Sequence, residues 1–128
     1  MNFDFLKKGK VAMIIDDQGR DHVIDLLSVD YYIAENKNTV KVEGLENYFT
    51  EHLPNSVHCY VSPAGAASFN EHTDPVDVKI VCVDGTKTME VNGEEIEIPA
   101  GKSITIPANT PHRATNKYRS TMLSVGYE

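Results

Sequence analysis

From Val57 to the end of the chain, short runs of apolar and β-branched residues alternate with turn residues. Runs of this kind, bounded by Gly, Pro, Asn and Asp, are typical of β-strands. Asn92-Gly93 predicts a hairpin, because both central residues of a type I′ turn have positive φ. Many short strands without helices between them predict an all-β sandwich or barrel. The predicted strands cover residues 58–62, 68–72, 76–83, 86–91, 94–98, 102–106, 112–116 and 121–127.

The first part of the chain has a mixed pattern and predicts a short αβ extension, residues 1–56, packed on a barrel formed by residues 57–128. A chain of 128 residues has room for one ordinary core, so we expect one structural domain overall. Strands are predicted at 11–15, 29–35 and 39–42. Two helices are predicted: a short one capped by Asp21, with Val23, Ile24, Leu26 and Leu27, and an amphipathic one over 44–53, with Leu45, Tyr48, Phe49, His52 and Leu53. His22 and His52 are interpreted as packed histidines rather than ligands.

The charge balance is acidic, with 19 Asp and Glu against 12 Lys and Arg and a formal net charge of -7. Such a surface repels phosphate backbones and anionic lipid, so we expect neither nucleic-acid nor membrane binding. No run approaches the ~20 apolar residues of a membrane span, and the first residues lack the apolar segment of a signal peptide. A cytoplasmic location is therefore predicted. Cys59 and Cys82 lie in apolar runs and are predicted to be buried, reduced thiols.

The residues with the strongest chemical signal are His72, Asp74 and His112. His72 and Asp74 are two apart, so in a strand they point to the same face. His112 follows a Pro-containing turn that a folded barrel can bring to the same end. Two imidazoles and one carboxylate form the facial triad of non-haem Fe(II) sites. The same residue types also bind Zn²⁺, which leaves a zinc hydrolase open, and HTDP taken alone also suits an ordinary surface turn.

Lys87 is the second candidate, because it shares a strand face with Met89 and Val91. That face is the apolar one, so the lysine is predicted to point into the barrel. A buried lysine is costly unless an anion compensates it. Two interpretations remain: a cation that receives a carboxylate inside the barrel, or a lysine that extends to solvent at the strand end.

Three stretches together resemble the JmjC-type, cupin-like Fe(II)/2-oxoglutarate oxygenases, in particular the ribosomal-protein hydroxylase branch. They are YVSPAGAASFNEHTDPVDVKIVCVDGTK, PAGKSITIPANTPH and LSVG, and the resemblance extends from Val57 to the end of the chain. It implies a double-stranded β-helix (cupin, jelly-roll) fold in which His72, Asp74 and His112 bind Fe(II). It also implies that Lys87 pairs with the distal carboxylate of 2-oxoglutarate. The further cosubstrate positions that it marks are Tyr60, His58, where the family often has asparagine, and Ser124 on the last strand.

The general small cupins provide an alternative resemblance, with a first motif HxHxxxxE and a later histidine. Here Asp74 replaces the second histidine and no glutamate stands at the fourth-ligand position, which favours the three-ligand oxygenase pattern. Because the chain ends at Glu128, directly after the last predicted strand, we expect a small-molecule substrate. The predicted function is thus a metal-binding Fe(II)/2-oxoglutarate-dependent dioxygenase (hydroxylase), with Zn, Ni or Mn as other metals in isolated protein. The alternatives are a minimal cupin acting as an isomerase, a 2-oxoglutarate-independent dioxygenase or a sensor, and a barrel with a relic site. Edge strands in the extension leave a homodimer open.

Overall fold

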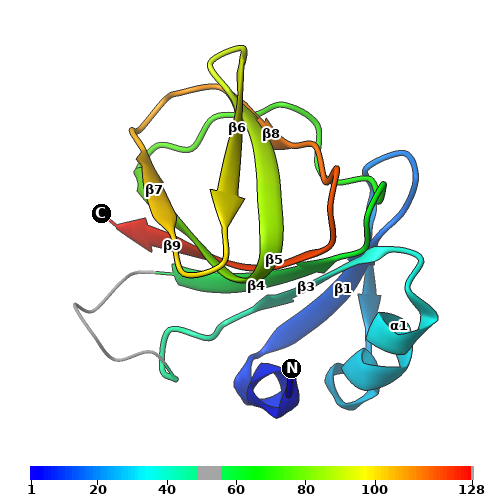
Figure 1. Cartoon of the computed structure of the whole chain (residues 1–128). Coiled ribbons are helices and arrows are strands. Elements are labelled where there is room, and N and C mark those ends of the chain that lie inside the picture. The colour runs from blue at the N-terminus through cyan, green and yellow to red at the C-terminus, as the bar shows by residue number, and fades with distance from the viewer. Residues whose placement is uncertain (49–55, 128) are drawn as a thin grey trace.

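The computed structural model describes residues 1–48 and 56–127, and these form two β-sheets with short helices on one side (Figure 1). In chain order the elements are the 3₁₀ helix η1 (Asp4–Lys8), β1 (Val11–Ile15), β2 (Asp21–Ile24), the 3₁₀ helix η2 (Leu26–Ser28), α1 (Val29–Glu35), β3 (Thr39–Glu43), β4 (Ser56–Ser62), β5 (Asp77–Val91), β6 (Glu94–Pro99), β7 (Ser103–Ile106), β8 (His112–Ala114) and β9 (Ser120–Tyr127).

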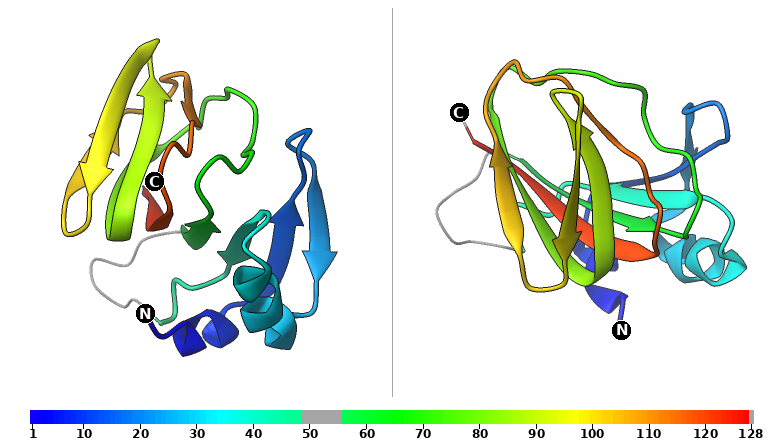
Figure 2. Two further views of the ribbon diagram at one scale, coloured as in Figure 1. Left: turned by 45° about the vertical axis from the view of Figure 1, so that its right-hand side comes forward. Right: turned by 45° about the horizontal axis from the view of Figure 1, so that its top comes forward.

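The long strand β5 belongs to both sheets. Its first part pairs with β7 and β9, and through β9 the larger sheet continues in the order β4, β3, β1 and β2. Its second part pairs with β6 and β8 in the smaller sheet, which lies opposite (Figure 2). The two predicted strands 76–83 and 86–91 are therefore one strand with a bulge between Cys82 and Asp84. This architecture confirms the predicted all-β jelly-roll fold.

Gly85 allows β5 to turn from one sheet into the other. Its φ is +70°, and a Cβ placed there would lie 2.0 Å from the backbone oxygen of Arg119 on the chain that enters β9. Glycine adopts this backbone conformation at low cost, and because it has no Cβ it leaves room for the neighbouring carbonyl.

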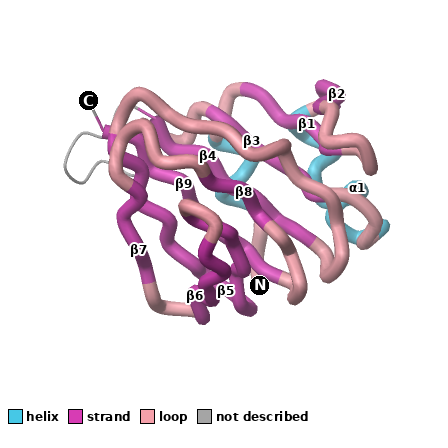
Figure 3. The backbone as a smooth tube through the Cα atoms, turned by 90° about the horizontal axis from the view of Figure 1, so that it is seen from above, coloured by secondary structure: helices cyan, strands magenta, loops and turns pink. Residues whose placement is uncertain are grey.

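Strands β3, β4 and β9 lie side by side and have different environments on their two faces (Figure 3). On one face, alternate apolar residues pack against η1, η2 and α1, which lie below the sheet in Figure 1. This core contains Leu6, Ala12, Val29, Val40, Val42, Leu45, Val57, Cys59 and Val61. The residues between them along the strands point into the barrel. The second core lies inside the barrel and contains Val78, Ile80, Cys82, Met89, Ile98, Ile106 and Met122.

Two of the predicted N-terminal elements are wrong. The helix predicted after Asp21 is instead the edge strand β2, paired with β1, and the capping carboxylate is Asp25, which accepts a hydrogen bond from Leu27 N. The strand predicted at 29–35 is helix α1, because Val29, Tyr32 and Ile33 are spaced three and four apart and meet the first core together.

Other predictions are confirmed or modified. A helix was predicted over residues 44–53. Residues 46–48 form a turn, and residues 49–53, including His52, lie outside the described part of the chain. Residues 68–72 form no strand apart from a β-bridge at His72. The Asn92-Gly93 hairpin is confirmed, with φ of 52° and 80°. Cys59 and Cys82 are buried and unpaired, as predicted. The division after residue 56 stays a prediction; β3 and β4 pair across it. No helix in the described residues is long and apolar enough to cross a membrane.

Candidate metal centre and cavity

The backbone holds the three predicted ligands at one end of the barrel. His72 lies in the connection before β5 and forms an antiparallel bridge with His112 at the start of β8. Each of the two residues donates its backbone N–H to the other's carbonyl, at 3.1 and 2.9 Å. The Asp74 carbonyl accepts a hydrogen bond from Asn109 N at 2.7 Å. Residues far apart in sequence are therefore fixed together by main-chain contacts before any ligand binds.

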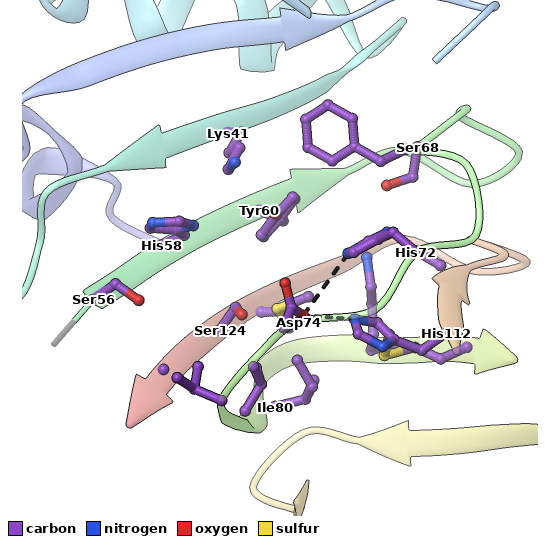
Figure 4. Close-up of a pocket in the computed structure, with 18 of the residues that line it drawn as sticks. Lys41, Ser56, His58, Tyr60, Ser68, His72, Asp74, Ile80, His112 and Ser124 are labelled. Carbon is purple, nitrogen blue, oxygen red and sulfur yellow. Dashed lines mark ion pairs between the residues drawn. The ribbon is translucent and has the colours of Figure 1, made fainter. Parts of the chain in front are cut away.

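The side chains of this triad point toward one another (Figure 4). His112 Nε2 lies 3.1 Å and His72 Nε2 4.0 Å from Asp74 Oδ2. All three ligand atoms lie within 4.8 Å of one another. His112 is buried, whereas His72 and Asp74 are partly open to solvent, so the triad lies where the barrel meets solvent.

Each histidine ring has a hydrogen-bond partner on the side away from Asp74, and this contact orients the nitrogen that faces Asp74. His72 Nδ1 lies 2.9 Å from the Asn70 carbonyl, and His112 Nδ1 lies 2.8 Å from the Thr110 carbonyl. A carbonyl only accepts, so each Nδ1 carries a proton, and in the neutral ring the lone pair that can bind a metal is then on Nε2. Histidine ligands of metals are held in this way by a second hydrogen bond. The donor set and its tautomers therefore fit a divalent metal bound by two imidazoles and one carboxylate.

A cavity of about 220 Å³ opens beside the triad. One wall is the barrel-facing side of β3, β4 and β9, and the opposite wall comes from β5 and β8. All the predicted cosubstrate positions line this cavity together with the triad: His58, Tyr60, Lys87 and Ser124. The structure thus brings every residue predicted for the site to one place.

Lys87 points inward, as the alternation along its strand predicted, and is 0% exposed. Its ammonium donates to Asn116 Oδ1 at 2.9 Å and to Ser62 Oγ at 3.5 Å. Both acceptors are neutral, and none of the ion pairs among the described residues includes Lys87. Burial lowers the pKa of Lys87 from 10.5 to about 8. The cavity therefore contains a cation that has hydrogen-bond acceptors but no counter-charge.

His58 and Ser124 are direct neighbours across β4 and β9, and Tyr60 lies two pairs further along β4, opposite Met122. Burial raises the pKa of Tyr60, so its phenol stays protonated and can donate. Burial, with a smaller contribution from Lys41, lowers the pKa of His58, which favours the neutral imidazole. These residues therefore add neutral hydrogen-bonding groups to the cavity, whose positive charge is carried by lysine side chains.

Sequence reasoning missed Lys41, Asn116 and Ser62. Lys41 lies on β3, is 8% exposed and lines the cavity. Its signal in the sequence is a lysine between Val40 and Val42, which turn to the other face of the strand. Asn116 and Ser62, both fully buried, had no sequence signal, because their role depends on lying beside Lys87 in the folded barrel.

The family comparison agrees with this architecture. The Cupin domain family matches residues 59–126, which is more than half of the chain. No curated protein sequence gives a match.

The solved structures with similar folds include both large and small proteins. The ribosomal oxygenase YcfD of Escherichia coli, in complex with cobalt and 2-oxoglutarate, superposes with a TM-score of 0.72 at 18% identity, over 100% of this chain and 44% of that protein. A conserved protein of unknown function from Streptococcus pyogenes gives 0.54 at 20% identity, over 57% of this chain and 63% of that protein. A cupin 2 conserved barrel domain protein from Leptotrichia buccalis gives a TM-score of 0.52 at 25% identity, over 57% of this chain and 35% of that protein. This chain thus spans less than two thirds of each of them. With the barrel, the His-Asp-His cluster and the sequence match in agreement, the chain belongs to the cupin domain family.

Proposed function

We propose that this protein is an Fe(II)- and 2-oxoglutarate-dependent oxygenase that acts on a small molecule. The observation that carries the proposal is a metal-type triad in the same cavity as a buried lysine without a counter-charge. The likeness to the Escherichia coli ribosomal oxygenase, whose structure holds cobalt and 2-oxoglutarate, supports the proposal at the level of fold.

In this proposal His72, Asp74 and His112 hold the metal through the two Nε2 atoms and one carboxylate oxygen. When bound by such a triad, Fe(II) supplies the O₂ chemistry of non-haem oxygenases, because positions on the ion stay open. The carbonyls of Asn70 and Thr110 keep both rings in the tautomer that binds metal. Zn, Ni or Mn could occupy the same ligands in isolated protein.

Lys87 binds the distal carboxylate of 2-oxoglutarate. A charge-assisted hydrogen bond is roughly twice as strong as a neutral one, and it is stronger still where water is excluded. A carboxylate beside the ammonium would also supply the missing counter-charge. Tyr60, whose ring centroid lies 5.9 Å from Lys87 Nζ, provides a phenol donor to the same ligand, and His58 and Ser124 line the remaining wall.

One observation favours a second function. Lys87 already has two hydrogen-bond acceptors in Asn116 and Ser62, so its position can be maintained without a ligand. A minimal metal-binding cupin that takes a small molecule without 2-oxoglutarate, as an isomerase, dioxygenase or sensor, is consistent with that arrangement.

The two functions are separated by titrating 2-oxoglutarate into protein loaded with Mn²⁺, which binds the same ligand types, under calorimetric detection. The first function predicts metal-dependent binding that Lys87→Met weakens by at least tenfold, since a hydrogen bond to a charged group contributes about 1.5–3 kcal/mol. Lys79→Met is the matched control, because it removes the same charge from the same strand outside the cavity. Absence of 2-oxoglutarate binding in the wild-type protein would reject the first function and leave the second.

A further inference from the structure

The cavity contains a second lysine, Lys41, whose role the proposed function does not explain. Lys41 enters from β3, directly opposite Tyr60 on β4. Its neighbours Val40 and Val42 turn to the core under the helices, so the lysine is directed into the barrel by strand alternation. Figure 4 shows it on the same wall as Tyr60 and His58.

The Lys41 ammonium is held in a defined place. It forms an ion pair with Glu43 at 2.8 Å and lies 4.9 Å from the Phe69 ring centroid and 5.5 Å from the Tyr60 centroid. An ammonium has three donors. Glu43 is its only ion-pair partner among the described residues, and the two aromatic rings offer π faces rather than acceptor atoms. Lys41 therefore keeps unused donor capacity in a place that is 90% shielded from solvent.

The two buried lysines lie near the same tyrosine but belong to different parts of the wall. Lys87 Nζ is 5.9 Å and Lys41 Nζ 5.5 Å from the Tyr60 ring centroid. Lys87 lies on β5 and donates hydrogen bonds to Ser62 and Asn116. Lys41 lies on β3 and forms an ion pair with Glu43. An acid bound at Lys87 would neutralise that lysine alone, whereas Lys41, paired with Glu43, still has donors left to bind a second acidic group.

From this geometry we infer that Lys41 forms a second carboxylate-binding subsite, and that the substrate is a small organic acid held there beside the cosubstrate. Ser56, His58 and Ser124 line the same wall and supply neutral hydrogen-bonding groups for the second oxygen of that carboxylate. The aromatic rings of Phe69 and Tyr60, which hold the ammonium, leave the adjacent space suited to an aliphatic or aromatic body. The inference rests on the proposed function for the assignment of Lys87 to 2-oxoglutarate.

The test uses butyrate as the probe and butyramide as its uncharged analogue of the same shape. Protein loaded with Zn²⁺, which has no redox chemistry, is titrated with each compound by ¹H–¹⁵N NMR, with and without saturating 2-oxoglutarate. The inference predicts butyrate binding in both conditions, at least about tenfold tighter than that of butyramide, with the largest shifts in β3 and β4. With 2-oxoglutarate bound at Lys87, Lys41→Met should lose this preference, whereas Lys79→Met, outside the cavity, should retain it.

Glu43→Gln provides a second test that does not depend on the folding of Lys41→Met. Removing the acid partner frees Lys41, so butyrate should bind more tightly to Glu43→Gln than to the wild type. If Lys41 served only to pair with Glu43 and pack on the rings, this variant would lose stability without gaining affinity.

Three results would overturn the inference: no saturable butyrate binding, equal binding of butyramide, or butyrate affinity unchanged by Lys41→Met. These outcomes are separate from the proposed function, which fails when 2-oxoglutarate does not bind. Butyrate binding through Lys41 without 2-oxoglutarate binding would reject the proposed cosubstrate and retain an acid-binding cupin.

Discussion

The cost of keeping Lys87 charged inside the barrel can be measured through its pH dependence. Its pKa falls from 10.5 in water to about 8 in the folded protein. At pH 7 and below, this difference destabilises the fold by about 3 kcal/mol, since each unit corresponds to about 1.4 kcal/mol. Lys87→Met removes that cost but leaves the Asn116 and Ser62 oxygens without their donor, which costs about 1–2 kcal/mol. The variant should therefore be more stable than the wild type at pH 7 by about 1–2 kcal/mol.

The sign of the pH dependence follows from where the proton binds. Between about pH 8 and pH 10.5 the unfolded chain keeps the proton on Lys87 while the folded chain releases it, so the stability of the wild type rises with pH in that window. Relative to Lys87→Met, the wild type should gain about 2 kcal/mol between pH 7 and about pH 9.5. Groups that titrate in the same way in both proteins cancel in this difference.

The assay is urea denaturation of metal-free wild type, Lys87→Met and the control Lys79→Met at both pH values. Lys79 lies on the same strand, is partly exposed and should show no such change. A stability difference between the wild type and Lys87→Met that does not change with pH would refute the depressed pKa of Lys87. A variant less stable than the wild type at pH 7 by more than about 2 kcal/mol would instead make Lys87 a hydrogen-bonding support of the fold.

Three further predictions concern the surroundings of the cavity. Asn116→Ala removes the 2.9 Å acceptor of the buried ammonium and should lower the unfolding free energy by about 1–3 kcal/mol in urea titrations; an unchanged value would show that water replaces the amide. Gly85→Ala should lower the melting temperature more than Gly93→Ala, because both have positive φ but only the first Cβ meets Arg119 O, at 2.0 Å; equal effects would contradict the close contact. Mn²⁺ at about 100 times its Kd should stabilise the wild type by about 2.7 kcal/mol and Asp74→Asn much less, measured by thermal unfolding with and without metal; equal stabilisation of both would place the metal elsewhere.

Local periodicity predicted the barrel well because its strands obey simple rules. Alternation along β5 directed Lys87 inward, and the Asn92-Gly93 turn fixed one hairpin. The spacing of His72 and Asp74 indicated a shared face, although the chain there forms only a bridge, and the contact with His112 came from main-chain pairing that no local pattern contains. The place of His112 beside His72 and Asp74 was therefore predicted from the family resemblance.

The N-terminal part was harder to predict because its elements are short and depend on neighbours. Residues 29–35 suit a strand by composition, yet the core beneath the large sheet selects a helix. Lys41 was overlooked for a related reason. Val40, Lys41 and Val42 alternate as in a strand with one face in solvent, whereas β3 is buried on both faces, by helices on one side and by the cavity on the other.

The central claim is that the triad holds a metal ion and that the nearby lysine receives an acid. The most direct measurement is a crystal structure from crystals grown without oxygen in the presence of Mn²⁺ and 2-oxoglutarate, with anomalous difference density to locate the metal. The account predicts a peak bonded to His72 Nε2, His112 Nε2 and an Asp74 oxygen, and a carboxylate of the organic acid on the Lys87 ammonium. A triad without metal at saturating Mn²⁺, or an acid bound away from Lys87, would contradict it.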